Sequence, residues 1–400
     1  MDITCLPSKF DGNVSAISSK SYVHRLLICL ALAKGETKIK YLKSADVIAT
    51  KNCLKEIFSN KQNKVLDAGE SGSTLRFLLP LSLAIGGEYE FIGHGKLIER
   101  PIADLVDVLS KHGAKITCQN TIKASGKLTV GDYAIRGDIS SQYVTGLLFA
   151  LSILDGVSTI TLTTPLASSP YVDITLKLML DFGIKVDVID TGYVVYGGTG
   201  YKMPKNLTSE GDWSNAGFML VGGAISNKCT VTGLNLDSTQ GDKVILDVLK
   251  SAGADVKTSS DTVTVYKNKL KAFTFDASNF PDTVPIVSVL ASCCDGVSVI
   301  KNIQRLTIKE SDRVQSVISM LSAVNIVAKR VDDDLIIYGG SPTGGVIDSF
   351  NDHRIAMSGA ILSLVANDDV KILGANAVNK SYPTFFDDFT LLGGKVKKDV

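Results

Sequence analysis

An internal repeat constrains the fold of this chain more than any other feature of its sequence. Six segments each begin with a polar cluster, continue as an apolar run rich in Leu and Ala, break at Gly, Asn or Asp, and end as a strand-like stretch. These segments begin at Ser18, Gly69, Ser140, Asp212, Pro281 and Asn351. Such self-similarity indicates that one supersecondary unit recurs along the chain.

A second element recurs between these segments, and it consists of an amphipathic helix, a glycine and an alternating strand. It is present in LVDVLSKHGAKITC (105–118), LKLMLDFGIKVDVI (176–189) and ILDVLKSAGADVKT (245–258), and LLGGKVKK (391–398) repeats its ending. The glycines of the three complete copies stand 70 residues apart. Apolar residues at i, i+3 and i+4 before each glycine, and alternation after it, predict a helix followed by a strand.

Together the two elements predict a βαβαββ unit that occurs six times, which is too long for a solenoid repeat. A chain of 400 residues exceeds the size of one hydrophobic core, so the six units divide into two domains of three. The polar loop 205–212 marks the division. We therefore expect an α/β (α+β) fold with a discontinuous domain of residues 1–18 plus 212–400, a second domain of residues 19–211, and a chain that crosses between them twice.

The composition excludes several classes of function. Lys plus Arg number 42 against 41 Asp plus Glu, which provides no charged field for nucleic acid or an anionic membrane. The seven cysteines show no Cys-x-x-Cys or Cys/His metal spacing, and their scatter is typical of a reducing compartment. No apolar run reaches the length of a membrane span, and the start MDITCLPSKFDG lacks the basic and apolar regions of a signal peptide. We expect a cytoplasmic protein.

The polar clusters at the predicted helix starts contain more cations than helix capping requires. One Ser, Asp or Asn is sufficient as a cap, and a cation at this end opposes the helix dipole. Yet NDHR adds Arg354, SKSYVHR adds Lys20 and Arg25, and ESGSTLR adds Arg76. A bound anion, shared by free backbone N–H groups and the cation, would explain the pairing. The cluster DWSN is explained by capping alone.

The motif KESDR has two interpretations. On a helix, Lys309 and Arg313 would face each other, and such a pair destabilises a helix by about 0.2–0.5 kcal/mol unless an anion joins them. An ordinary surface network neutralised by Glu310 and Asp312 explains the same residues. The candidate anion-binding residues are Lys20, Arg25, Arg100, Lys309, Arg313, Arg354 and Lys380, with Asp282 and Glu310 as candidate acids. This set favours acid–base transfer on phosphorylated or carboxylated small molecules.

Eight motifs in order resemble those of the EPSP synthases (3-phosphoshikimate 1-carboxyvinyltransferases), a family of enolpyruvyl transferases. They are SKSYVHR, ERPI, DISSQ, SSPYVDIT, PDT, KESDR, NDHR and NKSYP, and they span nearly the whole chain. The resemblance implies a monomer of two domains with three βαβαββ units each. It implies transfer of the enolpyruvyl group of phosphoenolpyruvate to the 5-hydroxyl of shikimate 3-phosphate, a step towards chorismate and the aromatic amino acids, without metal or cofactor.

The same resemblance implies a role for individual residues. Those implied for shikimate 3-phosphate are Lys20, Ser21, Arg25, Ser140, Ser141, Gln142, Ser168, Tyr171, Asp282 and Lys309. Those implied for phosphoenolpyruvate are Lys20, Gly72, Arg100, Gln142, Arg313, Arg354 and Lys380. Asp282 would accept the proton of the 5-hydroxyl, and Glu310 would handle the proton at the enolpyruvyl methylene. Glu70 and Arg305 stand where many members have asparagine.

Two alternatives are weighed against this interpretation. The sister enzyme that acts on UDP-N-acetylglucosamine shares the fold and the donor, but it usually has a reactive cysteine a few residues before the position of Arg100. This chain reads GHGKLIER there, with Lys96 and no cysteine. A non-catalytic anion-binding module is the other alternative, and binding alone does not require both Asp282 and Glu310.

Overall fold

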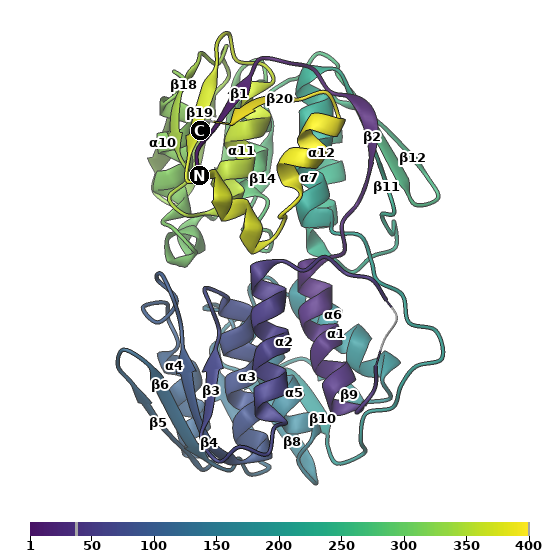
Figure 1. Ribbon diagram of the computed structural model, residues 1–400, viewed down its shortest axis with the longest axis vertical. Helices are drawn as coiled ribbons and strands as arrows, with labels where there is room; N and C mark the ends of the chain where they lie inside the picture. The colour runs from purple at the N-terminus through teal and green to yellow at the C-terminus, as the bar shows by residue number, and fades with distance from the viewer. Residues whose placement is uncertain (37–38, 399–400) are drawn as a thin grey trace. The chain divides into compact units, whose positions relative to one another are not determined.

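A computed structural model describes residues 1–36 and 39–398 of the chain. The chain forms two compact units, which are described one at a time (Figure 1). Unit 1 consists of Met1–Ser19 and Glu210–Val400, and unit 2 consists of Lys20–Ser209. Unit 2 is a single stretch of the sequence, whereas unit 1 is assembled from two stretches that lie on either side of it in the sequence.

The apolar runs of the repeat form six helices. In unit 2 they are α1 (Lys20–Leu32), α3 (Gly72–Ile85) and α5 (Ser141–Ser152), and in unit 1 they are α7 (Trp213–Ser226), α9 (Val284–Ser292) and α11 (His353–Ser363). A helix that is apolar all round belongs in a core, and every residue of α11 is indeed buried. In α5 every residue except Gln142 is buried. A side chain at Gly146 would collide with the carbonyl of Arg76, so α5 packs directly on the backbone of α3.

The described part of unit 1 contains three four-stranded sheets. The first has the order β18 (Gly345–Asp348), β19 (Val370–Leu373), β1 (Ile3–Leu6) and β20 (Lys395–Lys398). The second has the order β12 (Asp255–Ser259), β13 (Thr262–Tyr266), β11 (Lys228–Thr232) and β2 (Asp11–Ser15). The third has the order β14 (Thr274–Asp276), β15 (Val297–Lys301), β17 (Asp334–Tyr338) and β16 (Ala328–Val331). Because β1 pairs with β19 and β20, and β2 pairs with β11, the N-terminal residues belong to unit 1.

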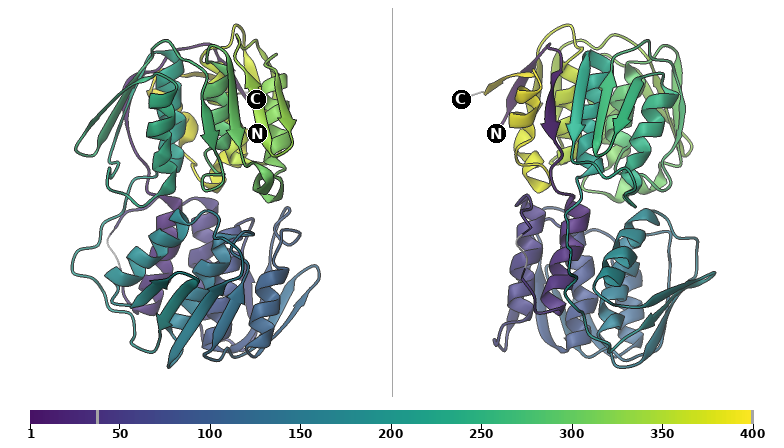
Figure 2. Two further views of the ribbon diagram at one scale, coloured as in Figure 1. Left: turned by 180° about the vertical axis from the view of Figure 1, so that it is seen from behind. Right: turned by 90° about the vertical axis from the view of Figure 1, so that its right-hand side faces the viewer.

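The described part of unit 2 contains two sheets of the same kind. One has the order β3 (Lys64–Asp67), β4 (Gly87–Ile92), β6 (Ile122–Gly126) and β5 (Ala114–Cys118). The other has the order β7 (Asp132–Ile135), β8 (Val157–Leu162), β10 (Gly192–Tyr196) and β9 (Val186–Ile189). Both have one parallel pair followed by two antiparallel pairs, as the sheets of unit 1 do. Figure 2 shows the sheets of each unit on the outside of its apolar helices.

The amphipathic elements form a second set of helices, α2 (Ala45–Ile57), α4 (Ala103–Lys111), α6 (Pro170–Asp181), α8 (Ile245–Ser251), α10 (Arg313–Ser322) and α12 (Phe385–Leu391). A short 3₁₀ helix precedes each of α8, α10 and α12, and these are η1 (Gly241–Val244), η2 (Gln304–Ile308) and η3 (Ala375–Lys380). The repeated glycines Gly113, Gly183 and Gly253 have φ angles of +104°, +81° and +89°. Glycine recurs there because the chain must leave each helix in a left-handed conformation. No helix in the described ranges is long and apolar enough to cross a membrane.

The first repeat differs from the others in the strands that follow its two helices. The sequence predicts a strand in ETKIKYL after α1, but residues 39–44 form no strand, and residues 37–38 lie outside the described residues. Ile39 and Tyr41 instead pack against the core of unit 2. After α2 the described chain continues to β3, which belongs to the sheet of the next block, so the first block has no hairpin to pair with. The strand prediction was wrong at residues 39–42 because alternation alone does not supply a hydrogen-bonding partner.

Candidate active site

In unit 2, the residues predicted to bind substrate lie mainly at helix starts. Lys20, Ser21 and Arg25 lie on α1, Gly72 begins α3, and Ser140, Ser141 and Gln142 begin α5, while Ser168 and Tyr171 lie at the start of α6 and Arg100 precedes α4. Helix starts carry backbone N–H groups without helical partners, and these groups suit anions. The arrangement in unit 2 therefore combines backbone donors with cationic side chains.

Arg25 is buried, and its donors face neutral oxygens. Its Nη1 donates to the carbonyl of Ser21 at 2.6 Å, and its Nη2 donates to the carbonyl of Tyr171 at 2.8 Å. Its Nε donates to the hydroxyl of Thr175 at 2.7 Å. Burial lowers the pKa of the Arg25 guanidinium from its usual value. Arg25 thus fixes the backbone of Ser21 and Tyr171, two other residues predicted to bind substrate. Its positive charge is held by neutral oxygens rather than by a carboxylate, beside the starts of α1 and α6.

Lys20 forms an ion pair that sequence analysis did not find. Its Nζ lies 2.7 Å from Oδ2 of Asp46, which is in the first turn of α2. The backbone carbonyl of Asp46 also accepts from the hydroxyl of Thr74 at 3.4 Å. Ser44 and Asp46 together resemble an ordinary capped helix start, so no local signal connects Asp46 to Lys20.

Gly72, Arg100 and Gln142 are brought together around a further arginine, Arg76. A Cβ atom at Gly72 would lie 3.0 Å from Nη1 of Arg100 and 3.2 Å from Nη1 of Arg76. Arg76 Nη1 donates to Oε1 of Gln142 at 2.8 Å, and Gln142 Nε2 donates to Oγ of Ser73 at 3.0 Å. The small residue at position 72 thus lets two guanidinium groups approach the start of α3.

The serines of the DISSQ and SSPY motifs have distinct local structures. Ser140 is the N-cap of α5, and its hydroxyl accepts from the backbone N–H of Gln142 at 3.3 Å. Ser168 is buried and has a φ angle of +58°, which is uncommon for a residue other than glycine. The carbonyl of Ser168 accepts from the N–H of Tyr171 at 3.2 Å, which closes the turn that begins α6.

In unit 1, Asp282 lies among three cations. Its Oδ1 is 2.6 Å from Nη1 of Arg313 and 3.6 Å from Nζ of Lys309, and its Oδ2 is 3.2 Å from Nη2 of Arg354. Burial disfavours the charged carboxylate, but Arg354, Lys309 and Arg313 outweigh this effect and hold the pKa of Asp282 well below its usual range. Asp282 is therefore ionised throughout the physiological pH range.

Arg313 joins both predicted acids and a third carboxylate. In addition to Asp282, its Nη2 donates to Oε2 of Glu310 at 2.6 Å and its Nε donates to Oδ2 of Asp352 at 2.8 Å. Its side chain is 1% exposed and that of Asp352 is 0% exposed, whereas those of Asp282 and Glu310 are 23% exposed. The network is therefore centred on a buried ion pair, unlike the ordinary surface network that was one interpretation of KESDR. Burial disfavours the Arg313 cation, but Asp352, Glu310 and Asp282 raise its pKa well above the usual value.

Lys309 and Arg313 do not share a helix. Lys309 follows η2, and Arg313 begins α10 with Asp312 as its N-cap, so the facing pair expected of a continuous helix is absent from this segment. The non-helical residues between them let both cations reach Asp282 from different directions. Burial is the main cause that lowers the pKa of Lys309 to about 8, while Asp282 opposes the shift and Arg313 and Arg305 add to it.

The NDHR motif that begins α11 combines capping with this network. Asp352 is the N-cap, and its Oδ1 accepts from the N–H of Arg354 at 2.9 Å while Oδ2 accepts from Arg313. Arg354 turns back and donates through Nη1 to the carbonyl of Asp282 at 3.0 Å. Lys380, at the end of η3, donates to the carbonyl of Asn351, which has a φ angle of +54°. The motif therefore draws Arg354 and Lys380 to the same helix start.

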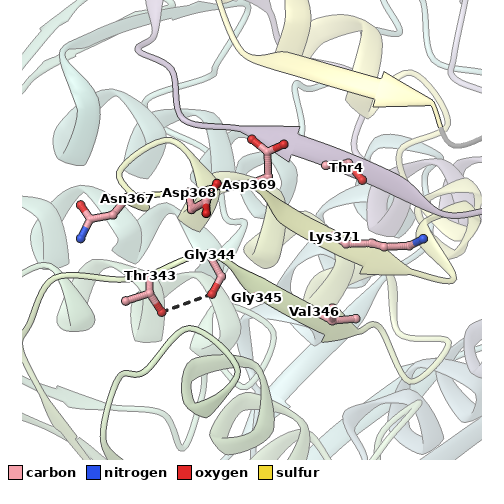
Figure 3. A pocket seen from close by; sticks show the side chains of 9 residues that line it. All are labelled: Thr4, Thr343, Gly344, Gly345, Val346, Asn367, Asp368, Asp369 and Lys371. Carbon is pink, nitrogen blue, oxygen red and sulfur yellow. Dashed lines mark hydrogen bonds between the residues drawn. The ribbon is translucent and has the colours of Figure 1, made fainter.

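A separate hollow in unit 1 contains no predicted site residue. It has a volume of about 610 Å³ and lies beside β18, β19 and β1 (Figure 3). Its lining residues are Thr4, Thr343, Gly344, Gly345, Val346, Asn367, Asp368, Asp369 and Lys371. Asp369 is paired with Lys397 at 3.4 Å. Across residues 1–36 and 39–398, no group of three or more His, Cys, Asp or Glu side chains could hold a metal ion.

The fold and the composition of these helix starts define the class of protein. The chain has the fold of an EPSP synthase from Acinetobacter baumannii, with a TM-score of 0.81 and 24% identity over 99% of this chain and 100% of that one. It also has the fold of the enolpyruvyl transferase NikO from Streptomyces tendae, with a TM-score of 0.78 and 16% identity over 99% of this chain and 98% of that one. The chain thus has an enolpyruvyl transferase fold.

The sequence comparisons are more specific. A family model described as EPSP synthase (3-phosphoshikimate 1-carboxyvinyltransferase) matches residues 6–389. The chain is 39% identical to the 3-phosphoshikimate 1-carboxyvinyltransferase of Clostridium kluyveri over 413 residues, which cover 98% of this chain and 97% of the relative. It is 36% identical to that of Clostridium novyi over 424 residues, 98% of each. The chain belongs to the EPSP synthase family.

Proposed function

We propose that this chain transfers the enolpyruvyl group of phosphoenolpyruvate to the 5-hydroxyl of shikimate 3-phosphate, giving 5-enolpyruvylshikimate 3-phosphate and phosphate. Membership of the EPSP synthase family supports this activity, as do the relatives of that name. The structural observation that supports it best is the position of Arg313, which donates to both Asp282 and Glu310. The reaction requires two acid–base groups, and this cation holds two carboxylates close together.

The chemistry gives each carboxylate a separate task. A bond forms between the 5-oxygen of the acceptor and C2 of phosphoenolpyruvate, while the hydroxyl loses a proton and the methylene carbon gains one. Phosphate then leaves, and the methyl carbon returns a proton as the double bond forms again. We assign Asp282 to accept the hydroxyl proton and Glu310 to donate and then remove the proton at carbon.

The cations in unit 1 connect substrate binding to the basicity of Asp282. Without substrate, Arg313, Arg354 and Lys309 stabilise the Asp282 carboxylate and make it a weak base. A phosphate or carboxylate group of the substrates would compete with Asp282 for the same donors. As these donors turn to the substrate, the pKa of Asp282 rises, so that its carboxylate becomes a stronger base when the hydroxyl is present.

The remaining residues supply binding and charge stabilisation. We assign Lys20, Ser21, Arg25, Ser140, Ser141, Gln142, Ser168, Tyr171 and Lys309 to shikimate 3-phosphate. We assign Lys20, Gly72, Arg100, Gln142, Arg313, Arg354 and Lys380 to phosphoenolpyruvate. Cations and backbone N–H groups that are already oriented stabilise the charge that moves from the enol phosphate to the leaving phosphate. The set requires neither a metal nor a cofactor, because each proton has a carboxylate to receive it.

A phosphate-release assay tests the proposal. The purified chain is supplied with phosphoenolpyruvate and with either shikimate 3-phosphate or UDP-N-acetylglucosamine, in buffer that contains a chelator. We expect phosphate release with shikimate 3-phosphate and none with the UDP sugar. Turnover with the UDP sugar alone would assign the chain to the sister activity, and turnover only after metal is added would refute the two-carboxylate mechanism.

We further propose that the protein is a monomer in the cytoplasm. The free cysteines in the described residues support a reducing compartment, since several of them are buried without forming disulfides. Sedimentation of the purified chain tests the monomer at assay concentration. A mass of twice 42.6 kDa would refute it.

A further inference from the structure

Arg76 is a buried arginine at the centre of three segments of unit 2. It lies in the second turn of α3, and its side chain is 5% exposed. Its Nη1 donates to Oε1 of Gln142 at 2.8 Å, and its Nη2 donates to the carbonyl of Pro101 at 2.8 Å. One guanidinium thus joins the start of α5 to the residue that follows Arg100.

The contact between Arg76 and Gln142 determines which way the Gln142 amide points. A guanidinium only donates hydrogen bonds, whereas a side-chain amide has one end that accepts and one that donates. Arg76 therefore requires the Oε1 end, and the Nε2 end must point elsewhere. Its observed position is 3.0 Å from Oγ of Ser73, on the first turn of α3. The amide is held at both ends in a single orientation.

Gln142 is well placed for a role at the surface of a site. It is the one residue of α5 that is not buried, while the neighbouring Ser141 and Tyr143 are. Its Nε2 carries two hydrogens, of which Ser73 accepts one. An inverted amide would instead present a carbonyl oxygen beside the start of α3, where it would repel an anionic ligand. The orientation that Arg76 selects is thus the one that favours an anion.

Arg76 also supports the segment that carries Arg100. The carbonyl of Pro101 accepts from Arg76 and, at 2.6 Å, from the hydroxyl of Tyr143. The Tyr143 ring lies 5.7 Å from the Arg76 guanidinium, which adds a cation–π contact. Gly72 leaves room for the guanidinium groups of Arg76 and Arg100 beside each other. Two like charges in this space repel each other, and a bound anion would offset that repulsion.

We propose that Arg76 is a positioning residue for phosphoenolpyruvate: its guanidinium fixes the Gln142 amide with its nitrogen end outward and holds the backbone beside Arg100. This inference rests on the proposed function, because that function assigns Gln142 and Arg100 to the substrate. Arg76 acts through these two residues, and its own donors serve the protein.

A double-mutant cycle on kcat/KM for phosphoenolpyruvate tests the inference. Arg76→Gln replaces a donor-only group with an amide that accepts or donates, so it no longer selects an orientation of Gln142. We expect Arg76→Gln and Gln142→Ala each to lower kcat/KM about tenfold, as expected for a lost hydrogen bond to a charged group. Both changes remove the oriented Gln142 amide, and Arg76→Gln also loosens the backbone beside Arg100. The double variant should therefore lose clearly less than the product of the two single losses. Losses that multiply in the double variant would overturn the proposal.

Matched variants separate positioning from folding. Arg136→Gln makes the same chemical change at an exposed arginine of unit 2, whose partner Asp138 lies at 2.8 Å, and it should leave kcat/KM unchanged. Arg76→Lys keeps the charge and a donor, so it should recover part of the loss. If Arg76→Lys performs no better than Arg76→Gln while both melt at the wild-type temperature, the donor-only character of residue 76 is not what orients Gln142, and the proposal is refuted.

A spectroscopic measurement on the wild-type protein is independent of activity. In protein labelled with ¹⁵N-glutamine, the side-chain amide of Gln142 is identified by its loss in Gln142→Ala. We expect the Gln142 amide protons to show cross-relaxation to Ser73, because the amide is held with its Nε2 end towards Oγ of Ser73. Gln142 amide protons without cross-relaxation to Ser73 would overturn the inference even in an active enzyme. If the wild type releases no phosphate, the proposed function fails, and this measurement still decides the positioning of Gln142.

Discussion

The charge of Lys309 should be lost within the pH range in which the protein can be assayed. Burial lowers the pKa of Lys309 to about 8 despite the nearby Asp282 carboxylate, and Arg313 and Arg305 lower it as well. A lowered pKa in a basic group means that the cation is present below about pH 8 and disappears above it. Any phosphate contact that depends on Lys309 must therefore weaken as the pH rises.

The size of the effect follows from the pKa. A group that titrates near pH 8 is about 90% protonated at pH 7 and about 10% protonated at pH 9. If only the protonated form binds shikimate 3-phosphate, kcat/KM for this substrate should fall about tenfold between these pH values. Arginine remains protonated throughout this range, so Lys309→Arg should remove the decline. Its absolute kcat/KM should be lower, because a planar guanidinium does not reproduce ammonium geometry.

The assay compares the two proteins across the pH range at low concentrations of shikimate 3-phosphate, with phosphoenolpyruvate in excess. Under this condition the rate reports kcat/KM, and hence ionisations of the complex that awaits shikimate 3-phosphate. The decline above pH 8 should be present in the wild type and absent in Lys309→Arg. The same decline in both proteins would show that another group titrates, and a flat wild-type profile would show that Lys309 remains charged or does not contact the phosphate.

Two further predictions concern the carboxylates in contact with Arg313. Asp282→Asn and Glu310→Gln keep the size of the side chain but remove proton transfer, so each should lower kcat about 10²–10⁴-fold. Ligand binding measured by calorimetry should change far less. A near-normal kcat with a lower melting temperature would show that the residue has a structural role. Asp352→Asn keeps a helix-capping oxygen but removes a buried charge from Arg313, so it should lower the free energy of unfolding by about 2 kcal/mol. An unchanged denaturation midpoint would show that Asp282 and Glu310 alone are sufficient to compensate the buried charge of Arg313.

Most of the fold could be predicted because its signals are local. Polar caps followed by apolar runs define α3 and α5, and the helix-ending glycines Gly113 and Gly183 have the left-handed conformation that favours glycine. The absence of the strand expected after α1 could not be predicted from such local signals. Strand formation at residues 39–42 depends on a neighbouring strand, and this dependence is not encoded in the alternation of the segment itself.

The partners of the site residues were less accessible to sequence analysis. The motif KESDR identified Lys309 and Arg313 as candidate anion-binding residues. It did not show that the chain between them is non-helical, which lets both cations converge on Asp282. Asp46 was missed because an acid in the first turn of a helix has an ordinary explanation. Its ion pair with Lys20 joins residues 26 positions apart in sequence, and only tertiary packing determines such a contact.

The two most buried arginines of the candidate site, Arg25 and Arg313, suggest an order of events. Both are almost completely buried, yet burial lowers the pKa of Arg25 while three carboxylates raise that of Arg313. An anion that meets Arg25 competes only with neutral oxygens and relieves a charge that burial disfavours. An anion that meets Arg313 must first displace Asp282 or Glu310, which costs part of an existing ion pair. The acceptor substrate assigned to Arg25 should therefore bind well by itself. Binding of phosphoenolpyruvate at Arg313 should be weaker alone and should release the two carboxylates to which we assign the proton transfers.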